Sequence, residues 1–410
     1  MLTVRHCLNP HGAVEEDEDE RDPLCGPKVL GNEENPVPLQ LPEFLVEKIV
    51  AKVPFPHILK ARQLSKQWKS KFSRVVAQVS PNWPEFYPAY FCKQRCRVEG
   101  YDREKRSIKR MGRRNIKPGG LDSSVTCCGT LMVAVEFIPE LSYLQPMATV
   151  TNLLTRRSRK VICPITPFRF DGEVVMYSAP ILAPFGTSHY ELIIWFSLMT
   201  VPSEQFQMTG VQMYNSASDI WKIVMFEDPL GGSQSAAYVD GSLYCIPDLL
   251  STARPVILKF DRSGAKTTIF LPDVDDQIHA ELVYQTLVGC GSRVLAVRFE
   301  YNRRIEEFQV RILRVDIQSL EVVELTKRTL YVNTRFLFET VQHPVVASSN
   351  SVYILDGAPD MGESLMCIKR YNVKTNTWDM DFFPFNLQKN CWGHRNLLVF
   401  EPGLNPFIVP

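Results

Sequence analysis

Hydrophobic positions follow a helical period in one short segment near the N-terminal end of the chain. Six of them form a single stripe: Leu41, Leu45, Val46, Ile49, Val50 and Val53. Pro42 suits a first helical turn, whereas Pro54 and Pro56 end the helix because proline donates no backbone hydrogen bond. Two more helical stretches follow, with apolar residues at Ile58, Leu59 and Leu64 and then at Trp68, Phe72, Val75, Val76 and Val79. We predict three short helices within residues 41–79.

The pattern changes from about Leu121 onward, where short apolar runs alternate with turns of Gly, Pro, Asn and Asp. Clear runs are Leu131–Phe137, Val256–Phe260, Val294–Phe299 and Ser351–Leu355. Runs of this length that are rich in β-branched and aromatic residues are typical of β-strands. Long helical periodicity is missing from this part of the sequence. We therefore predict an all-β domain.

One hairpin pattern recurs in this β-rich part. An apolar strand ends in Asn or Asp, a small polar turn follows, and a second strand returns, as in Met213–Trp221 and Arg370–Trp378. Fainter copies are Val150–Arg157, Lys259–Lys266 and Arg314–Leu320. The intervals between the anchors Asn152, Asn215, Asp261, Asp316 and Asn372 are 63, 46, 55 and 56 residues. Repeats of this size are typical of propeller blades and predict about six, with five or seven blades or an irregular β-sandwich as alternatives.

Charge refines the domain boundaries. The formal net charge is only +1, but Glu15–Glu20 is an acidic run and Lys93–Lys117 is strongly basic. Like-charge blocks are usually solvated tails or linkers. We predict a disordered acidic tail at 1–38, the helical domain at 39–80, a basic linker at 81–118 and a β-propeller at 119–410. Because aromatic residues are not interleaved with the basic ones, we expect no nucleic-acid partner.

Membrane, metal and catalytic motifs are weak. The apolar stretch at Leu192–Val201 is shorter than a membrane span, and the N-terminal residues lack the continuous apolar core of a secretory signal. We therefore expect a cytoplasmic or nuclear chain and no membrane partner. Most of the eleven cysteines lie in apolar runs, and Cys92 and Cys96 have no second pair nearby. His394, near Cys391 and Trp392, is the one cluster of note. We predict no metal, no cofactor and no catalytic residue.

The segment Leu41–Trp68 resembles an F-box. The resemblance rests on the opening Leu41–Pro42, on Leu45, Ile49 and Val53–Pro54, and on Leu59, Arg62, Leu64 and Trp68. The following β-rich part is similar to the propellers of the plant F-box/kelch family, through Val150–Arg157 and the closing Phe400–Glu401–Pro402. Two positions depart from the family: Phe44 replaces a usual acidic residue and Ser65 a common cysteine. The double glycine of strict kelch repeats is absent before most hairpins.

The resemblance implies a substrate receptor of an SCF-type (Skp–cullin–F-box) ubiquitin ligase, not an enzyme. The F-box would bind a Skp-family adaptor, and through it cullin, while the propeller would bind a protein substrate of unknown identity. The adaptor-binding residues that the resemblance implies are Leu41, Pro42, Ile49, Val53, Pro54, Leu59, Leu64 and Trp68. The alternative is a propeller enzyme or small-molecule receptor whose F-box controls its turnover.

Overall fold

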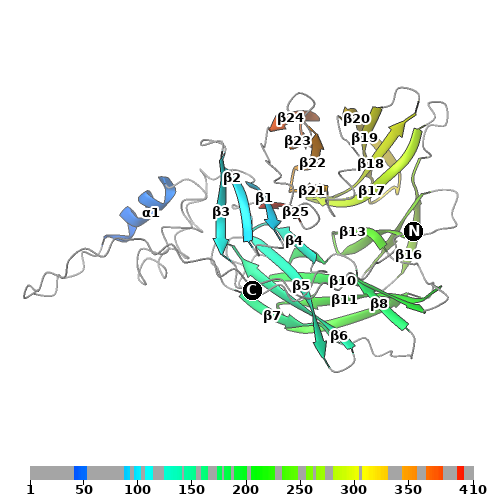
Figure 1. The fold of residues 1–410 in the computed structure, drawn as a ribbon, viewed down its shortest axis with the longest axis horizontal. Helices are drawn as coiled ribbons and strands as arrows, with labels where there is room; N and C mark the ends of the chain where they lie inside the picture. Colours follow the sequence, from blue (N-terminus) through cyan, green and yellow to red (C-terminus); the bar gives the residue numbers. More distant parts are fainter. Residues whose placement is uncertain are drawn as a thin grey trace, which may run out of the picture. The chain divides into compact units, whose positions relative to one another are not determined.

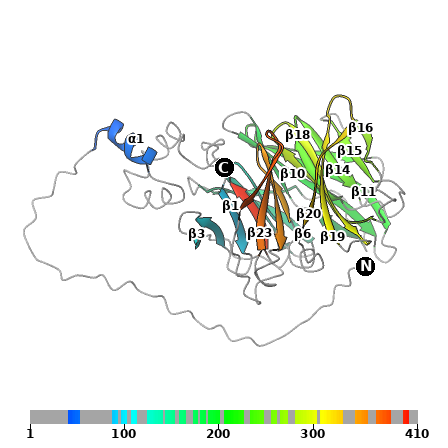
Figure 2. The ribbon, with the colours of Figure 1, turned by 90° about the horizontal axis from the view of Figure 1, so that it is seen from above.

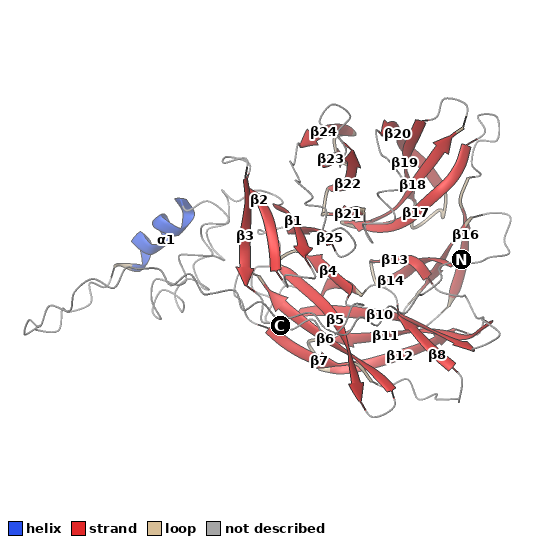
Figure 3. Cartoon of the chain, viewed as in Figure 1, coloured by secondary structure: helices blue, strands red, loops and turns tan. Residues whose placement is uncertain are grey.

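The computed structural model describes one helix and most of the β-rich part of the chain. The described residues are 41–52, 87–92, 97–102, 107–113, 124–140, 143–153, 158–164, 173–177, 180–185, 189–200, 205–226, 233–247, 255–261, 265–272, 280–303, 307–330, 344–357, 366–381 and 395–400. The chain divides into two units, residues 1–42 and 43–410. The predicted acidic tail and the predicted helices after residue 53 lie outside the described residues. Figure 3 shows the described helix, α1 (Glu43–Lys52), and otherwise strands and their turns.

The described strands form six antiparallel sheets. The first sheet contains β4 (Ser124–Cys128), β5 (Leu131–Glu140), β6 (Tyr143–Asn152) and β7 (Ser158–Ile162). The second contains β8 (Glu173–Tyr177), β9 (Ile181–Phe185), β10 (His189–Thr200), β11 (Gln205–Asn215) and β12 (Ile220–Phe226). In the second of these, both β8 and β9 pair with β10.

Three further sheets repeat the four-stranded pattern. The third sheet contains β13 (Ser233–Val239), β14 (Ser242–Pro247), β15 (Val256–Phe260) and β16 (Lys266–Phe270). The fourth contains β17 (Ala280–Cys290), β18 (Arg293–Asn302), β19 (Glu307–Val315) and β20 (Val322–Leu330). The fifth contains β21 (Val345–Ala347), β22 (Ser351–Gly357), β23 (Met366–Asn372) and β24 (Thr377–Asp381). The sixth sheet has the order β25–β1–β2–β3 and contains β1 (Tyr87–Cys92), β2 (Arg97–Asp102), β3 (Ser107–Arg113) and β25 (Arg395–Phe400).

Neighbouring sheets meet through one strand each, and these strands follow one another in a closed succession. Strand β4 lies next to β9, β9 next to β13, β13 next to β17, β17 next to β21, β21 next to β25, and β25 next to β4. Figure 1 labels all of these strands except β9, and Figure 2 shows the β-rich part of the chain from above. Sheets that adjoin radially in this way define a β-propeller. The predicted all-β propeller fold is therefore confirmed.

The sixth sheet corrects three predictions. Among the described strands, residues 119–410 supply five complete sheets and one closing strand, so the prediction of six blades from that segment alone is wrong. The segment predicted as a basic linker instead contributes β1, β2 and β3 to the remaining sheet. The prediction relied on the charge of this segment alone, and charge does not distinguish a linker from a strand. We expected the strand near Asn396 to pair in the last blade or near Leu131, but β25 pairs with β1 from Cys92↔Arg395 to Tyr87↔Phe400.

All five predicted hairpins join the last two strands of a sheet in chain order. Figure 1 labels both strands for three of them: β6 and β7, β19 and β20, and β23 and β24. In three of the five hairpins the anchor side chain accepts hydrogen bonds from backbone amides two and three residues later: Asn215, Asp316 and Asn372. A residue near the end of each of these turns has a positive φ: Asp219, Leu320 and Asn376. The short polar side chain thus replaces backbone partners that a tight turn cannot supply.

The apolar core lies in layers between consecutive sheets. One layer joins Trp195 and Val211 to Leu243 and Cys245, and similar layers fill the other three junctions between β4 and β24. Central strands are covered on both faces, so every residue from Leu243 to Pro247 is buried. This explains why such strands read as continuous apolar runs rather than as alternating ones.

Deletion of residues 395–410 should destabilise the propeller. The deletion removes β25 and leaves β1 with an unpaired edge that can template aggregation. We expect the thermal unfolding midpoint to fall by roughly 5 °C or more, because several kcal/mol are lost and each changes the midpoint by about 1–2 °C in a chain of this size. Calorimetry and light scattering measure both effects. Deletion of residues 401–410 is the control, and equal behaviour of the two variants would refute the closing role of β25.

Candidate functional site

Helix α1 (Glu43–Lys52) is the described part of the predicted docking domain. It begins directly after Pro42, and Lys52 lies in its last turn, where a cation interacts favourably with the helix dipole. Val46 is buried, with 3% of its surface exposed. One residue of the predicted apolar stripe is therefore shielded from water, as expected for an amphipathic helix.

Large side chains of α1 are also exposed. Phe44, about half a turn round the helix from Val46, is 57% exposed. Ile49, on the predicted apolar stripe, is 42% exposed, while Leu45 is half-buried. Lys48 and Lys52 are also exposed. The Lys48 ammonium lies 6.0 Å from the centre of the Phe44 ring, at the outer limit of a cation–π contact. The exposed side of α1 thus combines apolar and cationic groups.

Three of the eight predicted adaptor-binding residues are described. Leu41 is 40% exposed, and Pro42 and Ile49 are exposed as well. The other five lie outside the described residues: Val53, Pro54, Leu59, Leu64 and Trp68. Phe44 stands out in the sequence as a departure from the family pattern, whereas Lys48 and Lys52 were not predicted as part of this surface. Their four-residue spacing from Phe44 could have placed them on the same face of the helix.

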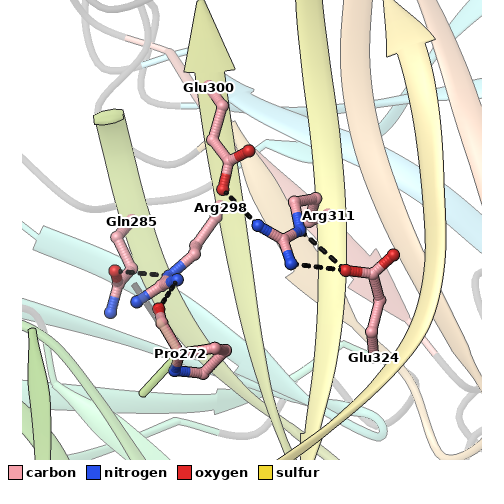
Figure 4. Close-up of polar contacts among 6 residues, drawn as sticks. All are labelled: Pro272, Gln285, Arg298, Glu300, Arg311 and Glu324. Atoms are coloured by element: carbon pink, nitrogen blue, oxygen red, sulfur yellow. Dashed lines mark hydrogen bonds and ion pairs between the residues drawn. The ribbon is translucent and has the colours of Figure 1, made fainter. Parts of the chain in front are cut away.

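The propeller contains a buried polar group at the junction of the β13–β16 and β17–β20 sheets. The Arg298 side chain is completely buried, and its Nε donates to Gln285 Oε1 at 3.0 Å (Figure 4). Arg298 Nη1 donates to the carbonyl oxygen of Pro272 at 2.5 Å. Arg298 lies on the same face of β18 as Val294 and Ala296, which pack against the β13–β16 sheet. The guanidinium therefore joins two sheets.

A ladder of charges crosses the β17–β20 sheet beside this group. The buried Glu300 carboxylate accepts a hydrogen bond from Arg311 Nη1 at 3.2 Å, and Glu324 accepts from Arg311 Nε at 2.7 Å (Figure 4). Burial alone would lower the pKa of Arg311, but the hydrogen bond to Glu324 and the charges of both carboxylates outweigh it and raise the pKa. Arg311 is therefore a permanent cation that offsets the charge of buried Glu300.

The described residues offer little reactive chemistry. No three His, Cys, Asp or Glu side chains among them lie close enough together to hold a metal ion. Burial raises the pKa of the Cys163 thiol to about 12 and raises the pKa of Cys245 further, so both remain thiols at neutral pH. No helix in this part of the chain is long and apolar enough to cross a membrane. The polar groups that the structure does describe mainly connect strands and sheets.

Replacement of Arg298 should test this structural role. Arg298→Ala removes the donor to Gln285 Oε1 and to the Pro272 carbonyl, and it leaves space in a buried layer. We expect the free energy of unfolding to fall by about 3 kcal/mol, since leaving the buried acceptor of Gln285 unsatisfied costs about 1–3 kcal/mol and the space left by the side chain adds to this cost. Glu324→Ala is the control, because loss of a partly exposed ion pair costs under about 1 kcal/mol. Equal denaturation midpoints for the two variants would contradict the proposed role of Arg298.

Comparison with protein families gives one match. Residues 38–83 match the F-box domain family. The match contains α1 and all eight predicted adaptor-binding residues, and it confirms the predicted F-box. The chain is thus an F-box domain followed by a β-propeller. In a comparison with curated proteins, nothing matches this chain.

Several solved structures resemble the chain weakly. An acylaminoacyl peptidase from Pyrococcus horikoshii is 8% identical with a TM-score of 0.35, over 61% of this chain and 38% of the peptidase. This chain therefore spans well under half of the peptidase's length. The β-propeller domain of the Trilobed protease from Pyrococcus furiosus is 9% identical with a TM-score of 0.37, over 63% of this chain and 70% of the domain. A functionally unknown protein from Desulfotomaculum acetoxidans is 10% identical with a TM-score of 0.37, over 76% of this chain and 98% of that chain.

Proposed function

We propose that this chain is the substrate-recognition subunit of an SCF-type ubiquitin ligase. The observation that carries the proposal is an F-box domain at residues 38–83 followed by a β-propeller. In such an arrangement the F-box binds a Skp-family adaptor and, through it, cullin. The propeller binds the protein to be ubiquitinated, and the chain itself catalyses no reaction. The complex works in the cytoplasm, the nucleus or both.

The recurring hairpins support a finer assignment to the kelch type of propeller. Asn215 and Asn372 each end the second-last strand of a sheet and cap the turn that follows. Each precedes a tryptophan on the last strand, Trp221 or Trp378. The ring of each tryptophan packs against a tyrosine of the second-last strand. This repeated unit favours a relationship to F-box proteins with kelch propellers, including the plant-type family.

Substrate recognition falls to the loops of the propeller in this proposal. The described sheets use their side chains to pack on one another, as the apolar layers between them illustrate. Loops on a rigid scaffold commonly carry binding residues, because they can vary without loss of the core. In this proposal the substrate is a protein, and several loops together bind it.

The Leu41→Ala, Pro42→Ala double variant should lose the adaptor. Loss of a buried apolar anchor at an interface typically costs roughly 2 kcal/mol, so two such losses weaken binding on the order of a thousandfold. A pull-down of a purified Skp-family adaptor by the full-length chain measures this effect. The thermal midpoint of the propeller should be unchanged, because sites without shared contacts behave almost independently.

The same variant separates adaptor recruitment from substrate capture. In cells it should retain and accumulate the substrate without ubiquitinating it, which mass spectrometry of affinity-purified complexes detects. Phe270→Ala, an exposed aromatic on β16, is the matched surface control. Equal adaptor binding by wild type and double variant, with both proteins folded, would end the SCF proposal.

A further inference from the structure

Two rows of side chains run along the exposed side of α1. Residues four apart lie on the same side of a helix, so Leu45 and Ile49 form one row and Phe44, Lys48 and Lys52 form the adjacent one. Ile49 belongs to the apolar positions expected to bind the adaptor. The second row contains the ring of Phe44 and the two exposed cations Lys48 and Lys52. Phe44 stands where the family that the chain resembles usually has an acidic residue. The two rows together make one continuous surface.

Phe44 is unusual within this surface. More than half of its ring is exposed, at 57%, although the helix buries the smaller Val46 almost completely. The ammonium of Lys48 lies 6.0 Å from the centre of the ring, so the ring and the cation belong to one patch of surface. Aromatic side chains offer a large apolar area with few rotatable bonds, which is why they often dominate interfaces.

The charge of the second row restricts the partner. Lys48 and Lys52 are both exposed and lie one helical turn apart. A partner that covers Phe44 must therefore approach two cations. Carboxylates opposite the two ammonium groups would speed association and exclude partners with a basic surface.

We propose that Phe44, Lys48 and Lys52 widen the adaptor contact and select among Skp-family adaptors. This inference rests on the proposed function. The selected adaptor presents an apolar pocket for the Phe44 ring and carboxylates that face Lys48 and Lys52. The apolar row provides the general affinity, and the second row provides the preference for an acidic adaptor surface.

The test measures the dissociation constant between the full-length chain and a purified Skp-family adaptor at low and at physiological salt. Phe44→Ala should weaken binding about tenfold at both salt concentrations, since it removes a single apolar anchor. Lys48→Gln, Lys52→Gln should weaken binding by about tenfold at low salt and abolish most of the salt dependence, because neutral side chains leave no attraction for salt to screen. Phe270→Ala, which alters an aromatic ring that is 64% exposed on the propeller, should change neither value.

The controls separate this inference from the proposed function. Circular dichroism confirms the fold of each variant, and Phe44→Leu supplies a milder change that keeps the helix apolar. If the wild type binds no Skp-family adaptor, the proposed function itself fails. If Leu41→Ala, Pro42→Ala abolishes binding while the Phe44 and lysine variants bind like wild type, the function stands and this inference is wrong. Self-association of the chain that depends on Phe44 would also overturn it, by assigning the surface to a second copy.

Discussion

Strand β25 lies beside β1 along its whole length, so one sheet joins residues 395–400 to residues 87–92. This pairing closes the succession of neighbouring strands that begins at β4, because β25 also lies next to both β4 and β21. Without it, the first and last sheets would each present a strand edge, and the layers between sheets would be open at one side. The stability of every other sheet therefore depends on a contact between the two ends of the propeller.

Apolar and polar residues have different roles in the packing between sheets. The apolar layers supply most of the free energy through burial, as at the junction of Leu243 and Cys245 with Trp195. Polar contacts fix where the sheets meet. Arg298 donates to Pro272 across one junction, Trp378 Nε1 donates to Thr326 Oγ1 at 3.0 Å across the next, and Arg159 binds Asp219 at 2.7 Å across a third. Apolar layers alone would allow neighbouring sheets to slide, whereas directional hydrogen bonds select one register.

The sequence predicted local features better than distant ones. The hairpin at Asn372 and the helix at Glu43–Lys52 depend on residues within a few positions, so turn and helix chemistry revealed both. The pairing of β1 with β25 joins segments about 300 residues apart, and no local pattern encodes such a contact. One feature of the sequence could have revealed the sixth sheet. Asp102 ends β2 just as Asn152 ends β6, and the number of residues between Asp102 and Asn152 is similar to the intervals between the other hairpin anchors. On α1, Phe44 was visible in the sequence, but its contact with Lys48 required the structure.

Ring closure also determines how the two domains are tethered. Residues 84–86 alone separate the F-box match at 38–83 from β1, the strand that pairs with β25. A short tether between two binding modules gives a high effective concentration of one partner near the other. If the β25–β1–β2–β3 sheet opened, residues 87–113 would join the tether and lengthen it. In the proposed ligase, the local concentration of a captured substrate near the adaptor would then fall, because it decreases with roughly the three-halves power of a flexible tether's length. Under the proposed function, the pairing of β25 with β1 would thus also keep this tether short.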